Sequence, residues 1–168
     1  PASQLMEAVN TVVSENGVLK GYTTDGSGYM RMLREYGVDV IHKKMVLAGA
    51  GGAARAIAIQ AALDGVAEIV IFNRSLDKAV KIADDINKHT GCIASAYSIA
   101  DTVQLSKALE NAALFTNATQ IGMAPRSGQS VIEDKGLLHP GLVVSDIVYN
   151  PRETKLLKMA EEQGCKTV

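Results

Sequence analysis

The fold of this chain is indicated most directly by residues 45–54, Met45-Val46-Leu47-Ala48-Gly49-Ala50-Gly51-Gly52-Ala53-Ala54. It joins a short apolar run to a glycine-rich turn, and an alanine-rich segment follows. A second apolar run, Ile69-Val70-Ile71-Phe72, then ends in Asn73-Arg74. A strand, a glycine turn, a helix and a second strand in this order predict a βαβ unit of the kind that holds a dinucleotide.

The glycine-rich turn provides candidate cofactor contacts at Gly49, Ala50, Gly51, Gly52 and Ala53. Gly49 allows the tight turn out of the strand, and Gly51 lets bare backbone approach a pyrophosphate. The helix that starts here directs free N–H groups and the positive end of its dipole at the phosphates. The alternative is a glycine turn in an α/β core that binds nothing.

The end of the second strand indicates which dinucleotide is bound. NAD-selective sites place Asp or Glu there, to accept hydrogen bonds from the ribose 2′-hydroxyl. This chain has Asn73, Arg74 and Ser75, with Lys78 one turn on. Because a guanidinium grips phosphate in two places and a carboxylate would repel it, we predict NADP, with NAD as the alternative. Asp77 weakens this prediction, and Arg74 with Lys78 would otherwise form a solvated helix start.

From Lys44 onward, expected strands and helices alternate along the chain. This order predicts an α/β fold of Rossmann type, a doubly wound parallel sheet of about six strands with helices on both faces. The last helix is expected to have Asn150 as its cap, Pro151 at its first position and Glu153 in a capping box. The other expected elements are a hairpin within 8–22, helices at 24–37, 76–89 and 101–110, and strands at 92–96, 112–116, 142–147 and 165–168.

Composition limits the class of protein. The chain has 168 residues, which is enough for one full domain. Its net charge is −1, so it lacks the excess of positive charge that would suggest binding to nucleic acid. No apolar stretch approaches the ~20 residues of a membrane span, so no membrane partner is expected. Cys92 and Cys165 indicate reduced thiols of a cytoplasmic protein, and the scattered histidines predict no metal site. An opening without Met indicates a piece of a longer protein.

Residues 117–139 form a long connection with little regular pattern. A connection of this length inside a compact domain is usually functional. It begins at the carboxyl end of an expected strand, where open parallel sheets place ligands. Asn117 and Thr119 lie at that edge. Their side chains either contact a cofactor or only form hydrogen bonds with the backbone of a turn.

Several separated segments, in this order, resemble the shikimate dehydrogenase family, including its quinate/shikimate dehydrogenase branch. They are Ala8-Val9-Asn10-Thr11-Val12, Thr24-Asp25-Gly26, Gly49 to Ala53, Asn73-Arg74-Ser75, Asn117-Ala118-Thr119 with Gly122-Met123, and Asp146 to Pro151. Family members have an N-terminal α/β domain for the substrate and a C-terminal Rossmann domain for the nicotinamide cofactor. The resemblance therefore implies that residues 1–23 end the first domain and residues 24–168 form most of the second.

The resemblance implies an oxidoreductase of the shikimate pathway in aromatic amino acid biosynthesis. Such enzymes transfer hydride between NADP(H) or NAD(H) and shikimate or 3-dehydroshikimate, and in one branch quinate. It implies substrate contacts at Asn10, Asp25 and Tyr149, and cofactor contacts at Asn117, Thr119 and Ile147 near the nicotinamide. Asp25 would pair with the family's catalytic Lys, which lies outside these residues, so the chain alone is expected to be inactive. A homodimer is the expected assembly.

The chemistry of Asp25 agrees with that role but leaves an alternative. Oxidising an alcohol requires removal of a hydroxyl proton, and a carboxylate beside an ammonium holds the proton carrier and adjusts its pKa. Otherwise Asp25 is a helix N-terminal carboxylate worth under ~1 kcal/mol. Tyr149 would otherwise be a half-buried strand-end tyrosine. Thr23 replaces the Asn usual in the family, which leaves the hydrogen bonding near Asp25 open.

Two other functions are compatible with the same glycine-rich turn, Gly49 to Ala53 (the glycine cradle). One is a non-catalytic module that binds or senses a dinucleotide, and the other is a two-domain dehydrogenase acting on folate or glutamyl-tRNA. A sensor has no need of Asn10, Asp25 or Tyr149, and the other dehydrogenases share the cradle but not the Asp25 and Tyr149 motifs. The cofactor-binding domain of a shikimate or quinate/shikimate dehydrogenase is therefore the leading expectation.

Overall fold

The centre of the molecule is a six-stranded parallel sheet. The computed structural model describes residues 5–6 and 9–168, and its sheet has the order β5-β4-β3-β6-β7-β8 with every neighbouring pair parallel. The chain starts at a central strand, moves outward to β5 and crosses back to β6, so the strand order reverses between β3 and β6. This doubly wound order confirms the predicted Rossmann-type fold. The strands are β3 (Lys44–Ala48), β4 (Glu68–Asn73), β5 (Ile93–Ser98), β6 (Leu114–Asn117), β7 (Val143–Asp146) and β8 (Lys166–Thr167).

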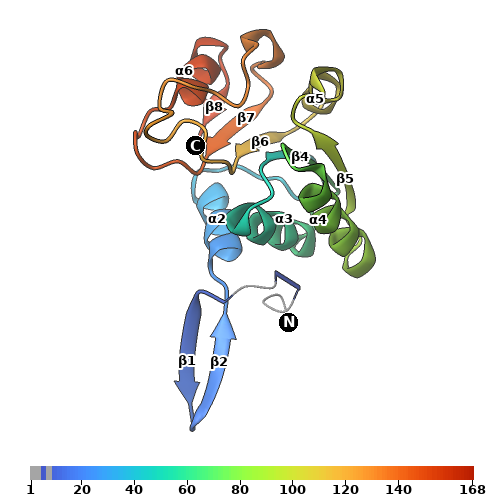
Figure 1. The fold of residues 1–168 in the computed structure, drawn as a ribbon, viewed down its shortest axis with the longest axis vertical. Coiled ribbons are helices and arrows are strands. Elements are labelled where there is room, and N and C mark those ends of the chain that lie inside the picture. Colours follow the sequence, from blue (N-terminus) through green and yellow to red (C-terminus); the bar gives the residue numbers. More distant parts are fainter. Residues whose placement is uncertain (1–4, 7–8) are drawn as a thin grey trace.

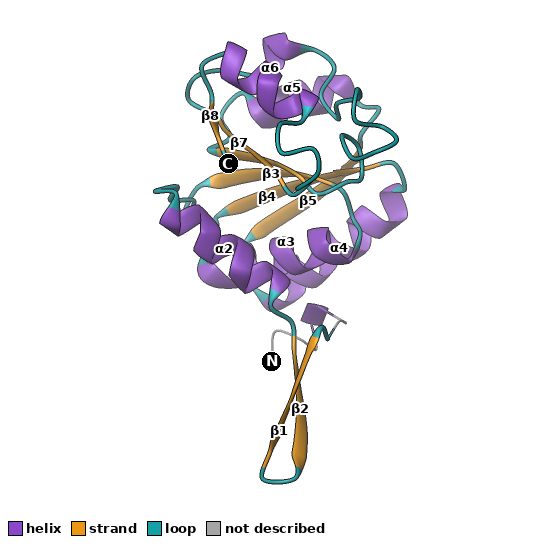
Figure 2. Ribbon diagram, turned by 90° about the vertical axis from the view of Figure 1, so that its left-hand side faces the viewer, coloured by secondary structure: helices purple, strands orange, loops and turns teal. Residues whose placement is uncertain are grey.

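Helices cover both faces of the sheet (Figures 1 and 2). One face carries α2 (Asp25–Glu35), α3 (Gly52–Asp64) and α4 (Leu76–His89), and the other carries α5 (Thr102–Leu109) and α6 (Lys155–Glu162). In β3, Met45 and Leu47 belong to one apolar core, whereas Val46 and Ala48 belong to the other. Because both faces are buried, the strand has an unbroken apolar sequence. None of the described helices is long and apolar enough to cross a membrane.

The expected hairpin projects away from the sheet and its helices (Figure 1). It consists of the antiparallel strands β1 (Thr11–Glu15) and β2 (Val18–Tyr22). Ala8, where the extended segment was expected to begin, lies outside the described residues. Several apolar side chains of the hairpin are exposed, with Val12 at 62% and Leu19 at 73%. Exposed apolar side chains grouped in this way are typical of a surface that contacts another part of a protein.

The last helix begins later than the sequence predicts. Its N-cap is Thr154, whose Oγ1 accepts a hydrogen bond from the Leu157 N–H at 3.3 Å. The predicted cap at Asn150, with Pro151 at the first position, is therefore wrong. The reason lies in tertiary structure: Thr154 is fully buried and its hydroxyl also donates to Asp146 Oδ2 at 2.8 Å. That buried contact fixes the start of α6 one turn further on.

Tyr29 joins α2 to the sheet through a buried hydrogen bond. The distance between its hydroxyl and Thr116 Oγ1 is 2.7 Å, and both side chains are buried. Burial raises the pKa of Tyr29 to about 12, and hydrogen bonds with Ser145 and Thr116 offset part of that rise. The neutral phenol is thus the form that the folded chain stabilises.

Tyr29→Phe is expected to lower the free energy of unfolding by about 1 kcal/mol at neutral pH, because the Thr116 hydroxyl loses its partner. Above pH 10 the unfolded tyrosine ionises while the buried phenol stays neutral. Through this group, wild-type stability then falls by up to about 1.4 kcal/mol per pH unit, and the variant lacks that slope. The stability gap between the two proteins should therefore shrink as the pH rises from about 8 to about 11 in urea unfolding. A constant gap would contradict the raised pKa.

Candidate functional site

A cavity of about 570 Å³ lies at the carboxyl ends of the strands, where the strand order reverses. Open parallel sheets bind their ligands at this place. The loop after β3, the end of β4 and the segments after β6 and β7 supply its walls. The fold thus gathers most of the predicted cofactor residues around one cavity, namely Gly49, Ala50, Gly51, Gly52, Ala53, Asn73, Arg74, Lys78, Thr119 and Ile147.

The turn after β3 requires glycine at position 49. Gly49 has a φ of +116°, and a Cβ there would lie 2.6 Å from the backbone oxygen of Ala118. By contrast, a Cβ on Gly51 or Gly52 would meet no atom within 4 Å, so the main chain is bare beside the cavity. Gly51 is the N-cap of α3, and the first turn of that helix has no acidic residue. Its free N–H groups and positive dipole end are therefore available to an anion.

The end of β4 places two cations at the same cavity. Asn73 Nδ2 donates to the backbone oxygen of Ser75 at 2.8 Å, which fixes the turn that carries Arg74. Arg74 and Lys78 are exposed and line the cavity, and within the described part of the chain neither has an ion-pair partner. Ser75 is the N-cap of α4, and its backbone oxygen accepts the hydrogen bond from Asn73. Unlike the other predicted residues of this segment, it does not line the cavity. Two exposed positive charges thus lie where Rossmann domains bind the adenosine ribose.

A second cavity of about 230 Å³ shares Asn73, Arg74, Thr119 and Gln120 with the first. Its other walls are mostly apolar, and they include Arg126, which sequence reasoning missed. Arg126 belongs to the long connection after β6 that the sequence marks as functional, but no local pattern singles out this arginine. A flat aromatic ring suits apolar walls with a guanidinium group, since guanidinium planes stack on aromatic faces.

A buried hydrogen-bond network supports the wall formed after β6. Asn117 is fully buried, and its Nδ2 donates to the Ile121 backbone oxygen at 3.0 Å and to Asp146 Oδ1 at 2.9 Å. Its Oδ1 accepts from the Thr119 N–H at 3.1 Å and from Thr119 Oγ1 at 2.7 Å. The amide of Asn117 is therefore engaged within the chain, and Thr119 is the residue of this pair that lines the cavity.

Asp146, to which the sequence pattern assigns no role, is the centre of this network. Besides Asn117, it accepts hydrogen bonds from the Val148 N–H at 3.0 Å and from Thr154 Oγ1 at 2.8 Å. Burial raises the pKa of Asp146, and these hydrogen bonds offset part of the rise. The carboxyl group ties the ends of β6 and β7 to the start of α6, which holds Ile147 and Val148 against the cavity.

The expected substrate residues Asn10 and Asp25 meet at the base of the hairpin. Asn10 Nδ2 donates to Asp25 Oδ1 at 2.7 Å, although the two residues are 15 positions apart. Asn10 Oδ1 accepts from the Thr24 N–H at 3.0 Å and from Thr24 Oγ1 at 3.2 Å. Both Asn10 and Asp25 are exposed. Tyr149 is 84% exposed rather than half-buried, and none of these three residues lines the two cavities.

Cysteines and metal-ligand residues contribute nothing further to the site. Cys92 and Cys165 are buried free thiols, and burial raises the pKa of both, for Cys92 to about 11. Over residues 5–6 and 9–168, no group of three or more His, Cys, Asp and Glu side chains is arranged to hold a metal ion.

The sheet order, the glycine turn and the cavity between them define a nucleotide-binding domain of the Rossmann type. Comparison with known proteins narrows this class. The sequence profile of shikimate / quinate 5-dehydrogenases matches residues 32–135, and the chain belongs to this family. The resemblance carried by the separated sequence motifs is thereby confirmed.

Individual members of the family are similar to this chain over its whole length. The shikimate dehydrogenase (NADP(+)) of Listeria monocytogenes serotype 4b is 53% identical, and the quinate/shikimate dehydrogenase of Escherichia coli O139:H28 is 46% identical. The crystal structure of shikimate 5-dehydrogenase from Listeria monocytogenes in complex with shikimate and NAD gives a TM-score of 0.98 at 53% identity. Each comparison covers 100% of this chain and 59% of the relative, so the chain spans 59% of the length of these proteins.

Proposed function

We propose that this chain is the cofactor-binding part of an NADP-dependent shikimate dehydrogenase, which interconverts shikimate and 3-dehydroshikimate. The proposal rests on the cavity where the strand order reverses, with the glycine cradle on one side and the exposed Arg74 and Lys78 on another. Family membership and the shikimate and NAD bound to the Listeria relative support it. Quinate is the alternative substrate, since the Escherichia coli relative is named for both.

The residues around the cavity fit a nicotinamide dinucleotide. Open space at Gly51 and Gly52 admits a pyrophosphate to the main chain, and the free N–H groups at the start of α3 donate to its oxygens. We assign the nicotinamide end to Thr119 and Ile147, with Asn117 as the support of Thr119. When bound, the nicotinamide supplies the hydride acceptor for oxidation of an alcohol.

We assign Asn73, Arg74, Ser75 and Lys78 to the adenosine ribose and its 2′-phosphate. A guanidinium binds phosphate through two parallel hydrogen bonds. Among the described residues, no Asp or Glu lines either cavity, so no carboxylate there repels a phosphate. This charge pattern favours NADP over NAD.

We assign Asn10, Asp25 and Tyr149 to the substrate end of the site. Oxidation of the alcohol requires a group that accepts its hydroxyl proton. In this proposal a Lys outside the chain carries that proton, and the Asp25 carboxylate stabilises its ammonium form. The hydrogen bond of 2.7 Å from Asn10 orients the carboxylate.

We propose that residues 1–23 end a substrate-binding domain and that residues 24–168 belong to the cofactor-binding domain. The projecting hairpin with exposed Val12 and Leu19 supports this division, because such side chains are expected to pack on another domain. The chain alone then turns over no substrate. We further propose a cytoplasmic location, which two buried reduced thiols favour, and a homodimer as the assembly.

Arg74→Ala is expected to weaken binding of NADP by about tenfold or more and to leave binding of NAD within about twofold. The reason is that a hydrogen bond to a charged group contributes about 1.5–3 kcal/mol, and only NADP carries the 2′-phosphate. Titration calorimetry of the full chain with both nucleotides measures the change. Arg31→Ala, which removes an equal charge from the exposed pair with Glu35 on α2, is the matched control.

Two results would count against these assignments. Equal weakening of NADP and NAD by Arg74→Ala would remove the phosphate contact. A wild-type chain that binds neither nucleotide would remove the proposed function itself.

A further inference from the structure

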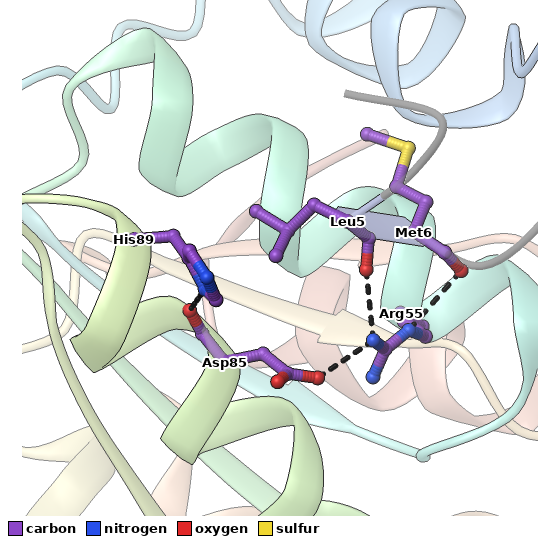
Figure 3. Close-up of polar contacts among 5 residues, drawn as sticks. All are labelled: Leu5, Met6, Arg55, Asp85 and His89. Atoms are coloured by element: carbon purple, nitrogen blue, oxygen red, sulfur yellow. Dashed lines mark hydrogen bonds and ion pairs between the residues drawn. The ribbon is translucent and has the colours of Figure 1, made fainter. Parts of the chain in front are cut away.

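Arg55 holds Leu5 and Met6, which precede the hairpin, against two helices (Figure 3). It lies in the first turns of α3, where its Nε donates to the Met6 backbone oxygen at 3.1 Å and its Nη2 to the Leu5 backbone oxygen at 2.8 Å. The same Nη2 donates to Asp85 Oδ2 on α4 at 2.6 Å. His89 contacts the backbone oxygen of Asp85 at 2.9 Å. One guanidinium thus joins α3, α4 and residues 5–6.

This junction is largely shielded from water. The side chains of Arg55 and Asp85 are 12% and 26% exposed, and Met6 is 2% exposed within the core beneath α2, α3 and α4. Charge-assisted hydrogen bonds are stronger than neutral ones, and partial burial reduces their screening by solvent. The contact therefore differs from an exposed ion pair, which contributes little.

The chain that leaves the hairpin is fixed at the next residue of α3. Gly26, in the first turn of α2, packs so closely on Ala56 that a Cβ would lie 2.3 Å from the Ala56 backbone oxygen. Adjacent residues of α3, Arg55 and Ala56, thus contact residues 5–6 before the hairpin and Gly26 after it. Asn10 and Asp25 lie between these two anchors, and α3 itself begins at the glycine cradle.

We propose that Arg55, held by Asp85, is a positioning residue that fixes the Asn10–Asp25 pair relative to the glycine cradle. This inference rests on the proposed function, in which the pair contacts the substrate and the cradle holds the cofactor. A reaction between two bound molecules depends on their mutual placement, and a shift of about 1 Å costs on the order of 10²-fold in rate. Arg55 lines neither described cavity and acts through the backbone of residues 5–6.

Arg55→Lys in the complete protein that contains this chain tests the proposal. The ammonium keeps the charge but lacks the planar fork that spans two carbonyls and a carboxylate. We expect kcat for shikimate oxidation to fall about tenfold, while the Kd for NADP, titrated without substrate, stays within about twofold. Hydrogen–deuterium exchange should rise over residues 9–24 and stay unchanged in β3 and β6. Asp85→Asn, which leaves the carbonyl contacts in place, should show a smaller change of the same kind.

The matched control is Arg31→Lys, which makes the same replacement in the exposed pair with Glu35 and should change neither readout. Unchanged exchange at the base of the hairpin, or unchanged kcat despite faster exchange, would overturn the proposal. So would a rise in the Kd for NADP as large as the fall in kcat, because Arg55 would then act on the cradle. A wild-type protein that does not oxidise shikimate would instead remove the proposed function, and hydrogen exchange alone would decide whether Arg55 fixes the hairpin.

Discussion

Asp25→Asn in the complete protein is expected to lower turnover of shikimate by about a hundredfold or more, while binding of NADP stays within about twofold. The Asp25 carboxylate accepts a hydrogen bond from Asn10 at 2.7 Å, and an asparagine oxygen accepts the same bond, so the local structure survives. What is lost is the negative charge beside the proton-carrying ammonium. Acid–base groups of this kind contribute about 10²–10⁴-fold, and the absorbance of NADPH formed at steady state measures the loss.

Asp101→Asn is the matched control for this prediction. Asp101 caps α5 by accepting a hydrogen bond from the Gln104 N–H at 3.0 Å, and Asn caps a helix as well as Asp does. The control removes the same charge from a helix N-terminus that lines neither described cavity. Loss of the favourable interaction with the helix dipole costs under ~1 kcal/mol of stability. Because Asp101 lies outside the proposed site, turnover by Asp101→Asn should stay within a few-fold of the wild type. Near-normal turnover in Asp25→Asn would reduce Asp25 to a structural role.

The sheet and its cofactor cradle are predictable from sequence because they require particular residue types in short stretches. Helices on both faces bury every side chain of β3 from Met45 to Ala48, so the strand has an apolar sequence without interruption. A φ of +116° then requires Gly49 at the end of that strand. Arg74 comes directly after β4, the second strand of the βαβ unit, where the sequence predicts the contact with the ribose phosphate. Each of these features can therefore be recognised in a short stretch of sequence.

The features that the sequence does not predict depend on polar contacts outside the local sequence pattern. The start of α6 is set by the buried contact between Thr154 and Asp146, so the favourable capping pattern at Asn150 is overridden. Arg55 lies 30 positions from Asp85 and 50 from Leu5, and only the fold brings them together. Arg126 likewise faces the cavity because of the path that the long connection takes. Hydrophobic periodicity carries no information about such polar contacts.

Gly49→Ala is expected to lower the free energy of unfolding by about 3 kcal/mol or more and to abolish binding of NADP. An alanine is strained at a φ of +116°, and its Cβ would lie 2.6 Å from the oxygen and 2.9 Å from the carbon of the Ala118 carbonyl. Both opposing atoms are main chain, so no side-chain rotation relieves the clash. The ends of β3 and β6 must separate, although the Ala118 N–H donates to the Ala48 oxygen at 2.8 Å. Backbone strain and overpacking each cost about 1–3 kcal/mol.

Gly51→Ala separates this structural requirement from the binding requirement. Gly51 has a φ of −83°, and a Cβ there would meet no atom within 4 Å, so alanine fits the folded chain without strain. Alanine is less favourable than glycine at an N-cap, but it also lowers the conformational entropy of the unfolded chain. Because these two effects oppose each other, the free energy of unfolding measured in urea should change by less than about 1 kcal/mol. Calorimetry should nevertheless show NADP binding weakened by about tenfold or more, because the methyl group stands where the pyrophosphate approaches the main chain. If Gly51→Ala bound NADP as tightly as the wild type, the pyrophosphate would have to lie elsewhere, and the glycine turn would serve the fold alone.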